Sequence, residues 1–121
     1  MANLQDIVER YLGAFNETDP SRRRVLVNEL YGADSTYVDP HVELRGPEQV
    51  ERFIAETQER FPGYTFRLGG PVDAHHSQAR FQWHAGPAGQ ADPLFVGFDV
   101  IVTEGERLRS VLGFMDAAPA A

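Results

Sequence analysis

The sequence has no cysteine and no lysine among its 121 residues. Without cysteine, the chain cannot form disulfide bonds, thiolate nucleophiles or cysteine-based zinc and iron–sulfur sites. Long apolar runs are missing as well: the longest, residues 94–102, contains Gly97 and Asp99 and is far too short to cross a bilayer. The first residues include Asp6 and lack the basic and apolar pattern of a secretory signal. We therefore expect a cytoplasmic protein that does not insert into a membrane.

Positive charge is also scarce. Eleven arginines stand against 18 acidic residues, which gives a formal net charge of −7. An acidic surface repels phosphate backbones, so we expect no nucleic-acid partner. The motifs that bind phosphates, dinucleotides or zinc through glycine-rich loops or an HExxH helix do not occur. Asp73 and His75 could share a strand face, but two ligands are a weak metal signal. The sequence predicts neither a metal nor a cofactor.

The length and a hydrophobic fraction of 42% suit one domain covering residues 1–121. Three helices are expected in the first half of the chain. The first has its apolar face at Leu4, Ile7, Val8, Tyr11, Leu12 and Phe15, after the capping residue Asn3. The second opens at Asp19-Pro20, presents Val25, Leu26, Leu30 and Tyr31 to the core, and ends at Gly32. The third opens at Gly46-Pro47, buries Val50, Phe53, Ile54 and Phe61, and stops at Pro62-Gly63.

The second half of the chain changes to a period of two, which is typical of strands. A short β-prone run at 35–38 precedes the third helix, and longer runs follow at 64–68 (continuing loosely to Val72), 79–84, 94–102 and 108–115. Turn signals at 86–89 and 104–106 separate the later runs. Consecutive strands joined by short turns predict an antiparallel sheet, with the helices packed on one face of it. The expected class is α+β.

The run at 94–102 is apolar on both of its faces. One set of alternating residues is Val96, Phe98, Val100 and Val102; the other is Phe95, Gly97, Asp99 and Ile101. An antiparallel strand that is covered on one face only normally alternates apolar and polar residues. One set can face the helices and a pocket, and we predict that the other contacts a second subunit, forming a homodimer through the sheet.

Three sequence motifs carry a resemblance to a known family. They are the first-helix pattern at Ile7–Leu12, the YVDP run at 37–40 and the GFDV run at 97–100. Together with the order of the elements they resemble the NTF2-like superfamily, and within it the SnoaL-like proteins and the ketosteroid isomerases. The ending at Arg107–Asp116 is similar to the closing SnoaL-like strand. The resemblance implies a cone of the cystatin-like type, in which three N-terminal helices pack on a curved, mostly antiparallel sheet and enclose a pocket.

The resemblance to the ketosteroid isomerases also implies three catalytic residues. By pattern, Asp39 matches the proton-shuttling aspartate, while Tyr11 and Asp99 match the two neutral donors to the enolate oxygen. The implied ligand is a small apolar molecule with a carbonyl group. The implied ligand-binding residues are Phe15, Tyr31, Phe53, Phe81, Trp83, Gly97 and Phe114, and no metal is implied.

Chemistry gives each candidate a second interpretation. Asp99 lies in an apolar run, where a buried carboxyl must be protonated, hydrogen-bonded or paired, for instance with an arginine. Asp39 precedes Pro40 and can simply form a turn. Tyr11 can be core, although its buried hydroxyl would still need a partner. His84 alternates away from Phe81 and is expected on the opposite face of its strand.

Two other functions stay open at the level of sequence. The chain can be a non-catalytic module, whose pocket binds a ligand or whose main property is dimerisation. It can also resemble the epoxide hydrolases of the same superfamily, which use an Asp–Arg–Asp relay. In that case Arg80 or Arg109 would have to reach the pocket.

Overall fold

The computed structural model of the chain describes residues 3–119. Helices and strands follow one another in the order expected for an α+β protein. The helices are α1 (Leu4–Asn16), α2 (Pro20–Leu30) and α3 (Gly46–Arg60). The strands are β1 (Tyr31–Val38), β2 (Glu43–Arg45), β3 (Tyr64–Leu68), β4 (Asp73–His75), β5 (Gln78–Pro87), β6 (Phe95–Glu104) and β7 (Arg107–Ala117).

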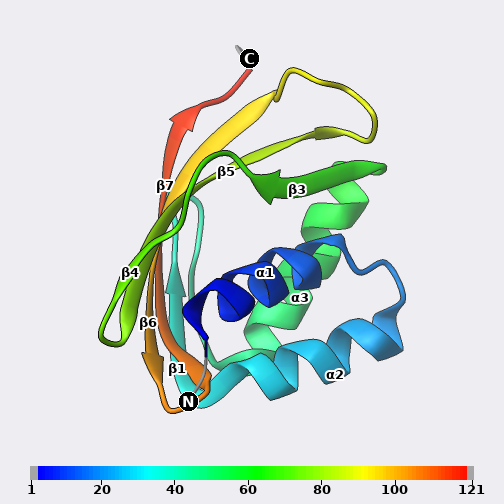
Figure 1. The fold of residues 1–121 in the computed structure, drawn as a ribbon. Coiled ribbons are helices and arrows are strands. Elements are labelled where there is room, and N and C mark those ends of the chain that lie inside the picture. Colours follow the sequence, from blue (N-terminus) through cyan, green and yellow to red (C-terminus); the bar gives the residue numbers. More distant parts are fainter. Residues whose placement is uncertain (1–2, 120–121) are drawn as a thin grey trace.

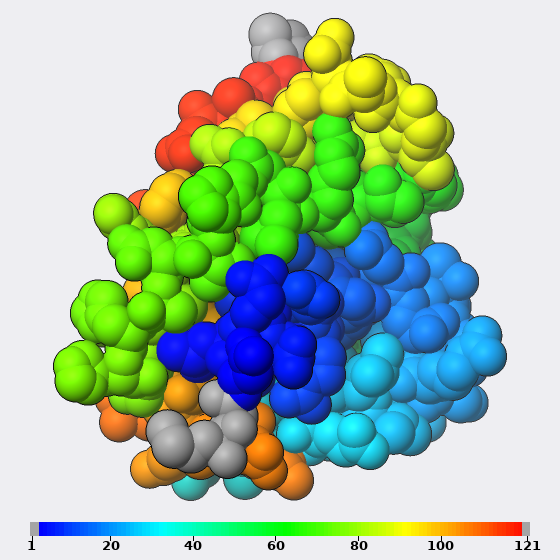
Figure 2. Space-filling model, in the orientation of Figure 1, coloured from blue at the N-terminus to red at the C-terminus, as the bar shows by residue number. Residues whose placement is uncertain are grey.

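All seven strands form one curved sheet, in the order β2-β1-β7-β6-β5-β3, with β4 also paired to β5. Only the contact between β1 and β7 is parallel, and the other pairs are antiparallel. The three helices lie on the same side of the sheet (Figure 1). In the space-filling view, α1 lies between the β3–β4 segment and α2 (Figure 2). The predicted architecture, three helices on a curved and mostly antiparallel sheet, is confirmed.

The helix starts follow the capping chemistry that the sequence contains. The side chain of Asn3 accepts hydrogen bonds from the backbone of Gln5 and Asp6, and Asp19 accepts one from the backbone of Arg22. Pro20 occupies the first turn of α2, where its missing N–H costs nothing. These local signals explain why the predicted starts of α1 and α2 are correct.

The end of α2 and its buried side differ from the prediction. The helix ends at Leu30, and Tyr31 already begins β1, because it pairs with Leu108 of β7 far along the chain. Val25 is 56% exposed, while Arg23 and Val27 are buried. An apolar pattern cannot find a buried face that contains an arginine. The short strands β2 and β4 were also not predicted, since three residues show no clear alternation.

Arg23 is buried because it joins the three helices. Its guanidinium donates to the Glu51 carboxylate on α3, to the Gln58 side-chain oxygen 2.7 Å away, and to the backbone oxygen of Glu17 after α1. Gln58 in turn donates to the backbone oxygens of Phe15 and Glu17. This partly buried cluster satisfies backbone oxygens at the C-terminal end of α1 and ties α2 to α3. The arginine run at 22–24 therefore has a structural role at its middle residue.

We expect Arg23→Ala to destabilise the fold by about 3–5 kcal/mol, because it leaves the Glu51 carboxylate partly buried without its cation. Chemical denaturation at neutral pH measures this change. Arg24→Ala, at the adjacent exposed position, serves as the matched control and should change the stability by less than about 0.5 kcal/mol. Equal effects of the two substitutions would contradict the assigned role of Arg23.

Candidate active site

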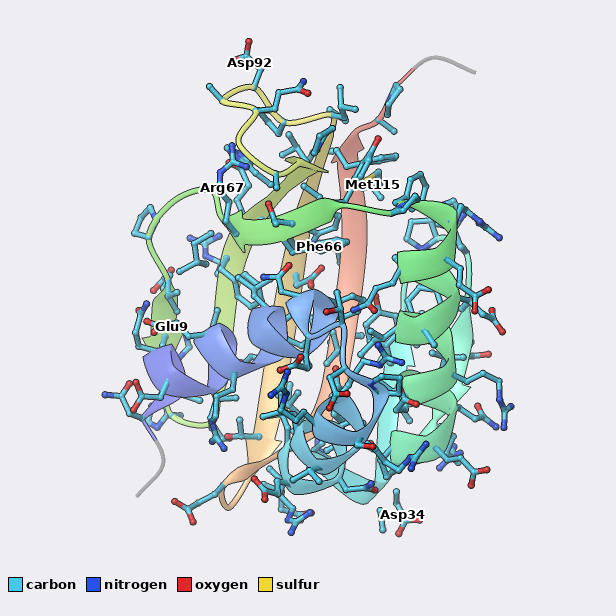
Figure 3. The ribbon with its side chains drawn as sticks, turned by 90° about the vertical axis from the view of Figure 1, so that its right-hand side faces the viewer. Glu9, Asp34, Phe66, Arg67, Asp92 and Met115 are labelled. Atoms are coloured by element: carbon cyan, nitrogen blue, oxygen red, sulfur yellow. The ribbon has the colours of Figure 1, made fainter. Side chains whose placement is uncertain are left out.

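An apolar cavity of about 400 Å³ lies between α1, α3 and the inner face of the sheet. Its walls are largely aromatic, with side chains from α1, β1, α3, β3, β5 and β6. The size and lining are typical of a site for a small organic molecule. Phe66 of β3 and Met115 of β7 line the end near β3, and Asp34 marks the opposite end of the molecule (Figure 3). Among residues 3–119, no helix has both the length and the apolar content needed to cross a membrane.

Three of the predicted ligand-binding residues line this cavity: Phe15, Phe53 and Trp83. They come from α1, α3 and β5, and the Phe15 ring contacts Phe53 edge to face at 6.3 Å between ring centroids. Helical periodicity predicted Phe15 and Phe53, because both lie on the apolar side of their helix.

The other four predicted ligand-binding residues do not line the cavity. Phe81 and Tyr31 are 1% exposed and belong to the core, and the Phe81 ring packs 5.8 Å from that of Tyr11. Phe114 is 59% exposed on the outer face of β7, opposite Phe98. Gly97 acts indirectly, since a Cβ at this position would lie 2.1 Å from the Trp83 ring. Gly97 thus provides the space in which Trp83 packs against the sheet.

Asp99 is buried behind the cavity wall and bonded to Tyr11. The Tyr11 hydroxyl donates to Asp99 Oδ2 over 2.6 Å, and the carboxyl is only 3% exposed. Burial raises the pKa of Asp99 from 3.8 to about 6. Hydrogen bonds from Tyr11 and Trp83 lower the pKa of Asp99 in part, whereas the charge of Asp39 raises it further. Among residues 3–119, no arginine forms an ion pair with Asp99, which argues against the alternative of a structural ion pair.

Burial also raises the pKa of the Tyr11 hydroxyl well above its usual value, with the Asp99 charge as the next cause. Tyr11 lines the cavity, whereas Asp99 is not among the lining residues. A protonated Asp99 can donate to the Tyr11 oxygen, which leaves the Tyr11 hydrogen free for a ligand. When Asp99 is protonated, the pair therefore presents one neutral donor to the cavity.

Asp39 directly follows the last residue of β1 and lines the cavity. Its Oδ1 accepts hydrogen bonds from the backbone of His41 at 2.8 Å and of Val42 at 3.0 Å, which builds the turn into β2. Its Oδ2 accepts one from the Tyr37 hydroxyl at 2.9 Å. Asp39 has both the turn-forming geometry and the cavity position that the sequence left as alternatives.

Gly113 of β7 brings the two aspartates together. A Cβ on Gly113 would lie 3.0 Å from Asp99 Oδ1 and 3.3 Å from the Cβ of Asp39. The register places Asp99 directly opposite Gly113, and the preceding pair of β7 and β1 is Leu112 with Val38. The two carboxyl groups thus flank one residue that has no side chain.

Sequence reasoning missed Tyr37, Phe66, His41 and Met115, which all line the cavity. For Tyr37 a signal was available, because it lies two residues before Asp39 and residues two apart share a strand face. Phe66 and Met115 could not be found in this way, since their facing depends on the register of β3 and β7.

Arg60, an exposed residue at the end of α3, also lines the cavity, whereas the other histidines and the two arginines considered for a relay lie elsewhere. His84 contacts the Gln82 side chain, while His75 and His76 lie at the β4–β5 hairpin. Arg80 pairs with Asp73 on the surface, and Arg109 is exposed, so neither reaches the cavity. Within residues 3–119, no three His, Asp or Glu side chains gather closely enough to hold a metal ion.

The model of the SnoaL-like domain matches residues 8–111, most of the chain. The chain belongs to the SnoaL-like family. A candidate isomerase of this family from Agrobacterium tumefaciens is 35% identical, with a TM-score of 0.87 over 93% of this chain and 97% of the other. A comparison with curated proteins finds no match.

More distant structures share the fold alone. A candidate polyketide cyclase from Sinorhizobium meliloti is 13% identical, with a TM-score of 0.70 over 89% of this chain and 93% of that one. An epoxide hydrolase-like protein from M. tuberculosis is 15% identical, with a TM-score of 0.67 over 92% and 80%. These relatives carry different names, so the fold of a SnoaL-like protein does not define its chemistry.

The raised pKa of Asp99 predicts how stability depends on pH. The folded chain binds this proton more tightly than the unfolded chain, so the Asp99 contribution to stability is lost as pH rises from about 4 to about 6. Asp99→Asn should therefore stabilise the fold at pH 7 by up to about 3 kcal/mol and change little at pH 4. Denaturant unfolding of both proteins at the two pH values measures the difference. A loss of stability at pH 7 would instead indicate that the charged carboxylate supports the fold.

Proposed function

We propose that this SnoaL-like protein is an enzyme that moves a proton next to a carbonyl group, as an isomerase or a cyclase. The observation that carries the proposal is the pairing of Tyr11, which lines an apolar cavity, with the buried Asp99, together with a second aspartate, Asp39, that lines the same cavity. Two carboxyl groups in contrasting environments are the usual basis of acid–base catalysis by aspartates.

In the proposed reaction, the Asp39 carboxylate removes a proton from the carbon beside the carbonyl. The electrons of the C–H bond form a C=C bond, and the carbonyl π electrons move to the oxygen, giving an enolate. Tyr11 donates a hydrogen bond to this oxygen and keeps its proton, while protonated Asp99 donates a hydrogen bond to the Tyr11 oxygen. Return of the proton from Asp39 to another carbon completes an isomerisation. Alternatively, the enolate carbon attacks a second carbonyl of the same molecule, whose π electrons move to its oxygen; return of the proton from Asp39 to this alkoxide completes an aldol cyclisation.

The proposed substrate is a small and mostly apolar cyclic carbonyl compound. Aromatic rings from six elements line the cavity, and they favour a flat ligand. An apolar site also strengthens the hydrogen bond that Tyr11 gives to a developing negative charge, because little water competes there. An Asp–Arg–Asp relay of the epoxide hydrolase type has less support, since Arg80 and Arg109 lie outside the cavity and Arg60, which lines it, is exposed and forms no ion pair with either aspartate in the described part of the chain.

We expect the protein to exchange the α-hydrogens of β-tetralone, an apolar bicyclic ketone, in heavy water. Asp39→Asn and Tyr11→Phe should each slow the exchange by about 10²-fold or more. The rate should also fall as pH rises through about 6, because ionised Asp99 no longer donates to Tyr11. Proton NMR of the ketone, together with appearance of the conjugated product from a β,γ-unsaturated cyclohexenone, measures these rates.

Asp116→Asn is the matched control, since Asp116 is an exposed aspartate of β7 outside the cavity. This variant should exchange at the wild-type rate. Tight binding of the ketone without any exchange would favour the ligand-binding module over the enzyme.

We also propose that the protein is a homodimer formed through the outer face of the sheet. The helices leave this face open, and Phe114 and Leu112 are 59% and 41% exposed there. Both lie directly opposite apolar residues of β6, Phe98 and Val100. A contiguous apolar patch on a sheet face is a typical subunit contact.

Phe114→Asp should convert the dimer to a monomer, because it places a charge in the centre of the proposed contact. Light scattering coupled to size-exclusion chromatography measures the mass. Val25→Asp changes an equally exposed apolar residue on α2 and should leave the dimer intact. A wild-type protein that is monomeric at high concentration would contradict the proposal.

A further inference from the structure

Asp39 accepts three hydrogen bonds from the protein, which is more than its role as a base requires. Carboxylate oxygens offer two lone pairs each, and the two Asp39 oxygens are used unequally. Oδ1 accepts two backbone hydrogen bonds from the turn, so its lone pairs are occupied. Oδ2 accepts one hydrogen bond, from the Tyr37 hydroxyl, and keeps one lone pair. Only one atom of the carboxylate can therefore accept a proton without breaking the turn.

Tyr37 is well suited to hold that atom in place. It precedes Asp39 by two residues on β1, so both side chains lie on the cavity face of the strand. Its ring packs 5.4 Å from Phe53 and 6.4 Å from Phe15, and the residue is 6% exposed. A ring fixed by two aromatic neighbours directs its hydroxyl along one line, and the Asp39 carboxylate lies on that line.

We propose that Tyr37 is a positioning residue that makes Oδ2 the proton-accepting atom of Asp39. This inference rests on the proposed function, in which Asp39 is the base. The Tyr37 hydrogen bond prevents rotation of the carboxylate and keeps the remaining lone pair of Oδ2 directed to the cavity. When a C–H bond of the ligand breaks, its proton goes to Oδ2, and its electron pair remains in the enolate. Tyr37 keeps its own proton throughout.

The hydrogen bond has a second consequence. It stabilises the charged form of Asp39, because a hydroxyl that donates to a carboxylate favours the ionised state. Without the Tyr37 hydrogen bond, Asp39 should hold a proton up to a higher pH, and the orientation of its carboxylate should be less well fixed. Loss of Tyr37 should therefore change both the rate and its pH dependence, which loss of a merely structural tyrosine would not do.

Carbon NMR of the Asp39 carboxyl in the ligand-free protein tests the inference without any substrate. Asp99→Asn is used as the background, so that Asp39 is the remaining carboxyl of the site that titrates. Adding Tyr37→Phe should move the Asp39 titration to higher pH. Tyr31→Phe is the matched control, because it removes another buried hydroxyl of β1, one with no hydrogen-bond partner. The Asp39 titration should stay unchanged in this control. Equal titrations in all three proteins would overturn the inference.

Kinetics with β-tetralone provide the second readout. In the wild-type background, Tyr37→Phe should lower kcat about 10-fold or more with little change in KM, and it should move the acid limb of the pH–rate profile to higher pH. A lower kcat with an unmoved acid limb would overturn the inference. Failure of the wild-type protein to exchange the ketone would count against the proposed function, whereas the NMR titration would still decide the role of Tyr37.

A measurement on the unmutated side chain covers the case in which Tyr37→Phe does not fold. With labelled tyrosine in the Asp99→Asn protein, the Cζ resonance of Tyr37 should follow the titration of Asp39, and that of Tyr64, which lines the cavity without bonding to Asp39, should not. A Tyr37 resonance that ignores the Asp39 titration would overturn the inference.

Discussion

The hydrogen bond between Tyr11 and Asp99 joins a helix to the middle of the sheet inside an apolar core. A carboxyl group there loses its hydration, and the structure responds with donors from α1 and β5 and with a pKa shifted toward the neutral form. The site therefore depends on close packing of α1 against the sheet. The same packing leaves the cavity on one side of Tyr11 and excludes water from the other.

Asp39 illustrates how one side chain can serve the fold and the chemistry together. One of its oxygens builds the turn from β1 to β2, as an aspartate before proline commonly does. The other oxygen faces Tyr37 and the cavity. The turn thus anchors the carboxylate of the proposed base at a fixed place in the cavity wall. Structural and functional interpretations of such a residue need not exclude each other.

The sequence alone allowed prediction of the fold class, the three helix starts and the aromatic residues on the helices, because these follow from local helix-start signals and periodicity. The face of the sheet to which each strand residue points was harder to predict. Phe114 points outward and Met115 inward because β7 pairs with both β1 and β6, with a register shift in each pairing. Tyr31 was assigned to a helix since its strand partner lies far along the chain. Such long-range pairings leave no local pattern to read.

Trp83 is the only tryptophan of the chain. Its ring packs over Gly97, lines the cavity and hydrogen-bonds with Asp99, so a single indole contacts both the ligand space and the buried acid. Indole emission responds to nearby charge and to water. The protein therefore carries its own optical probe, whose signal should report both occupation of the cavity and the protonation state of Asp99 without any added label.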